Sequence, residues 1–273
     1  MRPPPARTGD YARIIRLALF FATIISGVAV SSGAASVQRA QRSIHVRQAP
    51  RDISPIPNFM NICYPDGYDV SDPCFTQVAN ALQHALDVEH VPVQFDLANI
   101  ELQSPVVQLF IAANIDRTAR GLAPVEELVS DLNTVAARGV ASGSDPVLSA
   151  SPSVRIGGEN VVGWGSNWGR QTYNALGTEY FWMYEDGPHG YNLACKRGHA
   201  AGCMGHRMNI LATYDNAKPY CANHHLILSM GAAFAVSHSA PSFSEIFVAT
   251  CRAPRGEVIA RWNSFKHTVV IPK

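Results

Sequence analysis

Apolar side chains recur every three or four residues in four stretches of the chain, which is the spacing of one face of an α-helix. The pattern predicts helices over residues 75–88, 105–120, 124–139 and 171–186. The second is the best delimited, because a proline stands at its first position and Gly121 follows its last turn. We expect this helix to pack against the one after it.

Two later runs, 226–236 and 244–250, are rich in β-branched and aromatic residues and predict strands. They are expected to pair antiparallel across the turn that separates them. A short strand is expected at 157–162, directly after a loop rich in Ser, Gly, Asp and Pro. Helices, a short strand, a helix and then a strand pair together predict an α+β fold, a sandwich with a mainly antiparallel sheet.

The first 35 residues differ in kind from the rest. Four arginines precede an uncharged apolar run, Leu17 to Val30, and small residues follow that run. This order is typical of a secretory signal peptide. The run is shorter than the roughly 20 residues that span a bilayer, so we expect cleavage, with a retained N-terminal anchor as the alternative. The mature protein is expected to be secreted or in the cell envelope, touching the membrane only through an uncleaved signal.

Composition divides the rest of the chain into four parts. Residues 36–59 are polar and then proline-studded, and they predict a linker. Residues 60–103 carry the first two cysteines and are interpreted as an N-terminal elaboration tethered by a disulfide. Residues 104–253 form the main domain. Residues 254–273 are a tail, in which 268–271 either adds an edge strand or stays loose.

Charge and composition exclude several classes of protein. Hydrophobic residues make up 47% of the 273 and charged residues 16%, which argues against global disorder and against a multi-span membrane protein. The 22 basic side chains nearly balance the 21 acidic ones. The chain therefore lacks the excess of positive charge that binding to nucleic acid requires.

All six cysteines follow the signal, and an exported chain meets an oxidising compartment. Nearness in the sequence favours three disulfides: Cys63–Cys74, Cys195–Cys203 and Cys221–Cys251. A zinc site competes for the second pair, because Cys195, His199, Cys203 and His206 have the spacing C-x3-H-x3-C-x2-H. This spacing differs from that of the common zinc fingers, so the disulfide is the favoured interpretation.

Four polar residues stand where a core would not place them. They are Glu159 after two glycines, Glu185 at the end of an aromatic helix, and His199 and His206 in the cysteine loop. Together they could bind a divalent metal or act as acid and base. The alternative is that Glu185 is a solvated helix end and Glu159 a hydrogen-bonded loop residue. The sequence has no G-x-S-x-G, no glycine-rich phosphate loop and no H-E-x-x-H, so hydrolase and nucleotide-enzyme readings lack their usual support.

Four short motifs, in this order, resemble the CAP superfamily, also called SCP-like, which contains the cysteine-rich secretory, antigen 5 and pathogenesis-related-1 proteins. The motifs are Asn114-x-x-Arg117 leading to Gly121-Leu122, Gly158-Glu159-Asn160, Trp182-x-x-Glu185, and Gly205-His206-Arg207-x-Asn209-Ile210-Leu211. The last is similar to the form found in the bacterial branch. The resemblance covers residues 105–252 and implies a CAP-type α-β-α sandwich. It also implies a cleft with two glutamates and two histidines, which bind zinc or other divalent cations in some members.

The resemblance assigns Glu159, Glu185 and His206 to three of these four positions. The first histidine has no counterpart, since residues 138–158 contain none. Asp145 is the nearest substitute, and His189 or His199 are further ones. Three ligands hold a metal weakly, so we predict poor zinc binding or none. Equally open is a structural role, in which Glu159 and His206 hydrogen-bond to each other and to backbone amides.

The sequence thus predicts a secreted bacterial module, non-catalytic, whose cleft takes a small ligand such as a lipid, a glycan or a peptide. One alternative is a metal-assisted hydrolase or peptidase, in which Glu159 or Glu185 activates water beside His206. Another is a scaffold protein in which residues 60–103 bind a partner.

Overall fold

The structure, a computed structural model, describes residues 52–63, 68–91, 93–148, 155–170, 173–192, 195, 203–237 and 240–270. These residues fall within one compact unit of the chain, Ala40–Lys273. The predicted signal and most of the predicted linker lie outside the described residues. Among the described helices, none combines the length and the apolar character that crossing a membrane requires.

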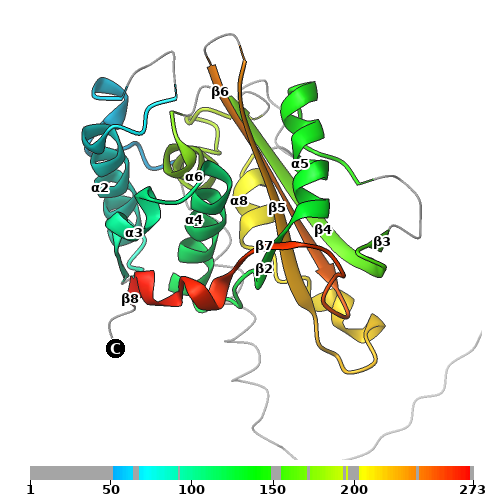
Figure 1. The fold of residues 1–273 in the computed structure, drawn as a ribbon. Helices are drawn as coiled ribbons and strands as arrows, with labels where there is room; N and C mark the ends of the chain where they lie inside the picture. The colour runs from blue at the N-terminus through cyan, green and yellow to red at the C-terminus, as the bar shows by residue number, and fades with distance from the viewer. Residues whose placement is uncertain are drawn as a thin grey trace, which may run out of the picture. The chain divides into compact units, whose positions relative to one another are not determined.

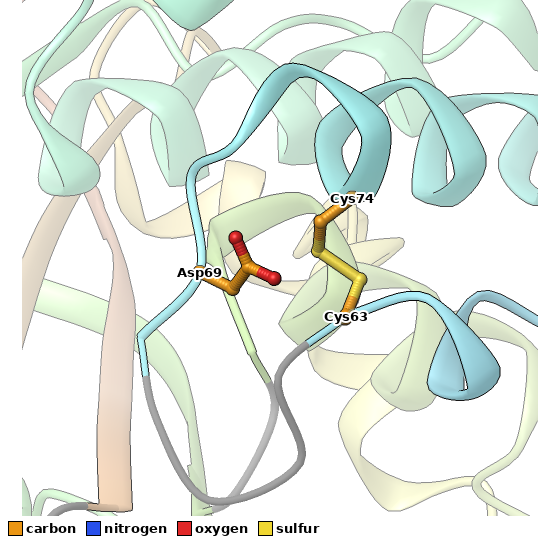
Figure 2. Close-up of side chains that lie close together, drawn as sticks. All are labelled: Cys63, Asp69 and Cys74. Atoms are coloured by element: carbon orange, nitrogen blue, oxygen red, sulfur yellow. A yellow bond between two sulfur atoms is a disulfide. The ribbon is translucent and has the colours of Figure 1, made fainter.

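The N-terminal part consists of the short helix η1 (Phe59–Asn61) and the long helix α2 (Asp72–Val88). The Cys63–Cys74 disulfide joins the residues after η1 to the first turn of α2, as Figure 2 shows. The apolar face predicted for α2 is buried, as Phe75, Val78 and Leu82 show. These side chains belong to the same core as the later helices, so the elaboration is packed into the main domain.

The next helices follow the predicted pattern with one difference. A short helix α3 (Leu97–Glu101) precedes α4 (Pro105–Ala119), which matches the prediction. The following stretch begins as a strand, β2 (Glu127–Val129), and the helix α5 (Ser130–Ser142) starts after it. The prediction missed β2 because its backbone pairs with two distant strands.

The main sheet has six strands in the order β3-β4-β6-β5-β2-β7. Besides β2, these are β3 (Arg155–Ile156), β4 (Glu159–Arg170), β5 (Ile227–Ser237), β6 (Ala240–Thr250) and β7 (Val258–Arg261). The predicted antiparallel pairing of the two late strands, β5 and β6, is confirmed. Because β2 runs parallel to β5, the sheet is mixed, in place of the mainly antiparallel sheet predicted. The α+β class is confirmed at the level of helices combined with a mixed sheet.

Helices cover both faces of this sheet (Figure 1). Successive side chains of a strand point to opposite faces, and β6 shows the result. Its Phe243 and Phe247 pack with the helices α2, α4 and α6 (Ala175–Tyr184) in the larger core. Its Ile246 and Val248 pack with α5 in a smaller core. The sheet is therefore buried on two sides.

Two segments, one predicted as a linker and one as a tail, make more contacts with the rest of the protein than the sequence predicted. Residues 52–59, predicted as linker, pack on α6: the Ile53 amide donates to the Tyr184 carbonyl at 2.8 Å, and the Tyr180 hydroxyl donates to the Ile53 carbonyl at 2.8 Å. Phe59 is fully buried. In the tail, 3-10 helices η4 (Trp262–Ser264) and η5 (Lys266–Thr268) lead to β8 (Val269–Val270), which pairs with β1 (Gln94–Phe95).

All three predicted disulfides are confirmed: Cys63–Cys74, Cys195–Cys203 and Cys221–Cys251. The alternative zinc site is not supported, because the sulfurs of Cys195 and Cys203 are bonded to each other. His199 lies outside the described residues. Three disulfides are typical of a chain that functions outside a reducing cytosol.

Candidate functional site

The Gly-His-Arg-x-Asn-Ile segment forms the short helix α8 (Gly205–Ile210), which is fixed from two sides. Arg207 is buried and donates to the Met183 carbonyl at 2.8 Å, at the end of α6. Asn209 donates from Nδ2 to the Ser166 carbonyl at 2.8 Å and to Asn167 Oδ1 at 3.0 Å, both on β4. This anchoring fixes the position of His206, which directly precedes Arg207 in the same helix.

The His206 ring lies between two carboxylates and against an indole. Its Nδ1 is 2.6 Å from Asp186 Oδ1, and its Nε2 is 3.7 Å from Asp145 Oδ1. The His206 backbone amide donates to the other oxygen of Asp186 at 2.8 Å. Trp182 stacks on the ring, with centroids 6.0 Å apart. We call these four residues the His206 cluster.

Exposure differs sharply across the His206 cluster. The side chain of Asp186 is 1% exposed, that of His206 is 21% exposed and that of Asp145 is 55% exposed. The surface of the cluster is therefore formed by the imidazole Nε2 and the Asp145 carboxylate. The buried Asp186 carboxylate contacts the ring on its other side, at Nδ1.

The protonation of His206 follows from these neighbours. Burial by itself lowers the pKa of His206, but hydrogen bonds and negative charges from Asp145 and Asp186 outweigh it and raise the pKa to about 10. At neutral pH the ring is therefore an imidazolium. It donates from Nδ1 to Asp186 and directs the Nε2 proton toward Asp145.

A third carboxyl, that of Glu245, is linked to the His206 cluster through Asn167. Asn167 donates from Nδ2 to Glu245 Oε1 at 2.7 Å and to the His206 carbonyl at 3.2 Å. Burial raises the pKa of Glu245 to about 8, although the Asn167 hydrogen bond and the charge of His206 act in the other direction. Burial therefore favours the protonated form of Glu245.

The N-terminal segment supports the turn that carries Asp186. The Asp52 carboxylate accepts from the Gly187 amide at 2.6 Å and from the His189 amide at 2.8 Å. A side chain at Gly187 would collide with Asp52, since an added Cβ would lie 2.5 Å from its Oδ1. Glycine at this position is what lets Asp52 reach the turn.

The structure does not bring Glu159 to His206. Glu159 is the first residue of β4 and pairs with Ile156 in a hairpin with β3. Asn167, which contacts His206, is eight residues further along the same strand. At roughly 3.3 Å per residue this separation is about 26 Å. Glu159 therefore belongs to the far end of the strand.

The other predicted residues divide between the cluster and its surroundings. Glu185 is buried at the end of α6; after burial itself, its charge is what raises the pKa of Tyr191. The carboxyl that meets His206 is thus the next one along, Asp186. Asp145 joins the cluster, whereas His189 is exposed and binds Asp52 through its amide.

The sequence contains a signal that could have located the correct part of β4. Gly165-Ser166-Asn167 repeats the G-x-N spacing of the motif around Glu159, seven residues later. It is this second copy that lies beside α8. An added Cβ at Gly165 would stand 2.6 Å from Asn209 Oδ1, so glycine is required for the contact.

The described residues do not fit a zinc site. At the His206 cluster only His206 Nε2 and Asp145 face a common point, while zinc takes three or four protein ligands. The group that does satisfy ligand distances in the described part of the chain is Cys63, Asp69 and Cys74. Figure 2 shows that its two sulfurs form a disulfide, and so they offer no thiolate.

Comparison with models of protein families, with curated proteins and with solved structures gave no match to this chain.

Proposed function

We propose that this chain is an exported binding module that resembles the bacterial branch of the CAP superfamily, has no catalytic activity of its own and contacts a small ligand at the His206 cluster. The observation that carries the proposal is the His206 ring held between a buried and a half-exposed carboxylate. Helices on both faces of a mixed sheet support the α-β-α sandwich of that resemblance. Three disulfides support export.

The first motif of the resemblance has a physical reason here. Asn114 binds the backbone of Val125 in both directions, accepting from its amide at 2.7 Å and donating to its carbonyl at 3.1 Å. Arg117 donates to the carbonyls of Ile210 and Ala212, at the end of α8. The motif on α4 thus holds the residues that follow His206, which supports treating the separate motifs as one unit.

The surface of the His206 cluster suits a neutral polar group. It offers one donor, His206 Nε2–H, beside one acceptor, the Asp145 carboxylate. One positive and two negative side chains give the cluster a net negative charge, which disfavours an anion such as phosphate. The hydroxyl of a glycan or sterol, or the amide of a peptide, presents the complementary acceptor and donor.

The hydrolase alternative has less support. That alternative needs Glu159 or Glu185 to activate water beside His206, but Glu159 lies at the far end of β4 from Asn167, which contacts His206. The three residues assigned to that alternative, Glu159, Glu185 and His206, do not converge. A non-catalytic role agrees better with this arrangement.

Ligand titration followed by NMR of the His206 ring tests the proposal on the full, disulfide-intact chain. The probes are a soluble oligosaccharide, a short uncharged peptide and a sterol in detergent micelles. We expect at least one probe to shift the His206 signals, and Asp145→Asn to weaken that binding tenfold or more. Asp131→Asn, at an exposed position on α5, is the matched control and should bind as the wild type does.

Two results would contradict this function. One is that none of the probes moves the His206 signals. The other is turnover of a probe by the wild type that is lost in His206→Ala, which would make the site catalytic.

A further inference from the structure

Glu179 lies in the middle of α6 with its side chain directed into the protein. The residue is fully buried, and neither of its carboxylate oxygens accepts a hydrogen bond from any described residue. Buried polar atoms without partners are rare because their desolvation is not repaid. The position of Glu179 therefore needs a physical explanation, and none comes from the His206 cluster.

The charged groups around Glu179 come from two other elements. From α4, Asp116 is within hydrogen-bonding reach and Arg120 is close by. From β6, Glu245 adds a second carboxyl. Burial raises the pKa of Glu179 well above its ordinary value, the charges of Glu245 and Asp116 raise it further, and Arg120 acts against them. We call Asp116, Glu179 and Glu245 the interior acid cluster.

The hydrogen bonds decide which of the two neighbouring acids is ionised. Asp116 Oδ1 accepts from Arg120 Nη1 at 2.6 Å and from the Tyr184 hydroxyl at 2.8 Å. Glu179 receives no such donor from the described residues. Donors stabilise a carboxylate, so the negative charge belongs on Asp116. The second oxygen of Asp116, Oδ2, is buried and has no donor in the described part of the chain.

The positive charge of Arg120 is already shared between two other acids, Asp116 and Glu89. Its guanidinium is already bonded to Asp116 and, through Nη2, to Glu89 at 2.5 Å. A second ionised acid beside Asp116 would leave two buried negative charges close together, which is the arrangement that makes one of two paired carboxyls keep its proton. A neutral Glu179 removes this repulsion and supplies the missing donor.

We propose that Glu179 keeps its proton in the folded chain and donates it to the carboxylate of Asp116, so that this pair is a pH-sensitive lock between α6 and α4. The lock is closed by a proton and opened by its loss. It stands apart from the proposed function, because it needs no ligand at His206.

The direction of the pH effect follows from linkage. A group with a raised pKa in the folded state contributes stability that is fully present below its ordinary pKa, here 4.5, and is lost as the pH rises toward the folded value. Within that window the ratio of folded to unfolded protein falls tenfold per pH unit for each such group. Asp116, Glu245 and His206 also have raised pKa values in the folded state, so they too make stability depend on pH. The informative quantity is therefore the difference between the pH profiles of wild type and variant.

The test is the pH dependence of urea unfolding for the full chain and for Glu179→Gln, whose amide can still donate to Asp116 but cannot titrate. We expect the free energy of unfolding to fall less steeply between pH 5 and pH 8 in the variant than in the wild type, because the variant lacks one titrating proton. At pH 8 the ratio of folded to unfolded protein should therefore be higher for the variant than for the wild type. Glu257→Gln, at an exposed position, is the matched control and should follow the wild-type profile. Parallel profiles for wild type and Glu179→Gln would overturn the proposal.

A second measurement tests the same proposal if Glu179→Gln fails to fold. Infrared spectra of Glu245→Gln at pH 7 should retain the C=O stretch of a protonated carboxylic acid, because Glu179 remains as its source. Absence of that band would overturn the lock. So would stability of the wild type that depends on the concentration of sodium or calcium and not on pH, since a buried cation would then neutralise Glu179.

Discussion

The His206 cluster and the interior acid cluster both place carboxyl groups close together, and they hold a proton in opposite ways. At His206 the carboxylates stay charged and the base keeps the proton, because Asp186 binds the imidazolium directly. In the interior, Arg120 donates to Asp116, whereas no described residue donates to Glu179. We therefore infer that Glu179, an acid, keeps the proton. On this proposal, burial and the donors around a carboxyl together decide its charge. Its residue type does not.

The largest expected effect comes from removing the cation of the interior. Arg120→Met leaves Asp116 and Glu89 buried without that partner, and we expect a loss of about 3–5 kcal/mol in the free energy of unfolding. Urea denaturation at pH 7 measures it. The loss should be smaller at pH 5, because burial raises the pKa of Asp116 and its carboxyl takes up a proton more readily at that pH. Arg252→Met, on the surface, should change stability by less than about 0.5 kcal/mol. Equal losses at both pH values would mean that packing, and not charge, explains the effect.

The next effect is on the buried carboxylate of the His206 cluster. Asp186→Asn removes the charge beside Nδ1, and we expect a loss of about 2 kcal/mol together with a His206 pKa well below 10. An NMR titration of the imidazole signals measures the pKa, and thermal unfolding measures the stability. An unchanged His206 pKa would show that Asp186 is not what holds its proton.

A smaller effect is expected at the N-terminal support of the same turn. Asp52→Ala removes the acceptor of the Gly187 and His189 amides, at a cost of about 1 kcal/mol. Hydrogen exchange at these two amides should become faster, while that of the interior strand β6 stays slow. Asp87→Ala, at an exposed position on α2, serves as the control. Unaltered exchange at Gly187 would contradict the role assigned to Asp52.

The smallest effect is expected at the exposed carboxylate. Asp145→Asn should cost at most about 1 kcal/mol at pH 7, because solvent and salt screen a half-exposed pair. The raised pKa of His206 contributes stability that is present below its ordinary 6.5 and lost as the pH approaches 10. Without Asp145 the folded pKa falls, so stability should decline less between pH 7 and pH 10. A steeper decline would contradict this sign.

Local patterns were sufficient to predict the helices α2 and α4 and the β5–β6 pair. The disulfides were predictable because export and nearness in the sequence limit the pairings. The strand β2 was missed because its three residues become a strand only between β5 and β7, which are distant in the chain. The residues next to β2 in the sequence do not indicate which distant strands it pairs with.

The site was predicted in part, for a related reason. His206 and the substitute Asp145 were named, but the motif was matched only at Glu159 and the second G-x-N copy at Gly165 was missed, since spacing cannot tell which copy meets α8. Glu185 was named and Asp186 was not, because both residues follow the end of α6, where helical periodicity no longer predicts which way a side chain points. Glu179 was not predicted because the apolar periodicity that predicted this helix indicates one buried face, whereas every position of α6 is buried.

The complete burial of α6 also predicts how the chain tolerates change. All ten residues of Ala175–Tyr184 are buried, whereas α5 buries only Leu132, Val135, Ala136 and Gly139 among its thirteen. In a library of random single substitutions, α5 should accept polar replacements on its outer face. Along α6, functional variants should be confined to replacements of nearly equal volume. The helix α6 would then be the part of the protein in which substitutions are most strongly selected against.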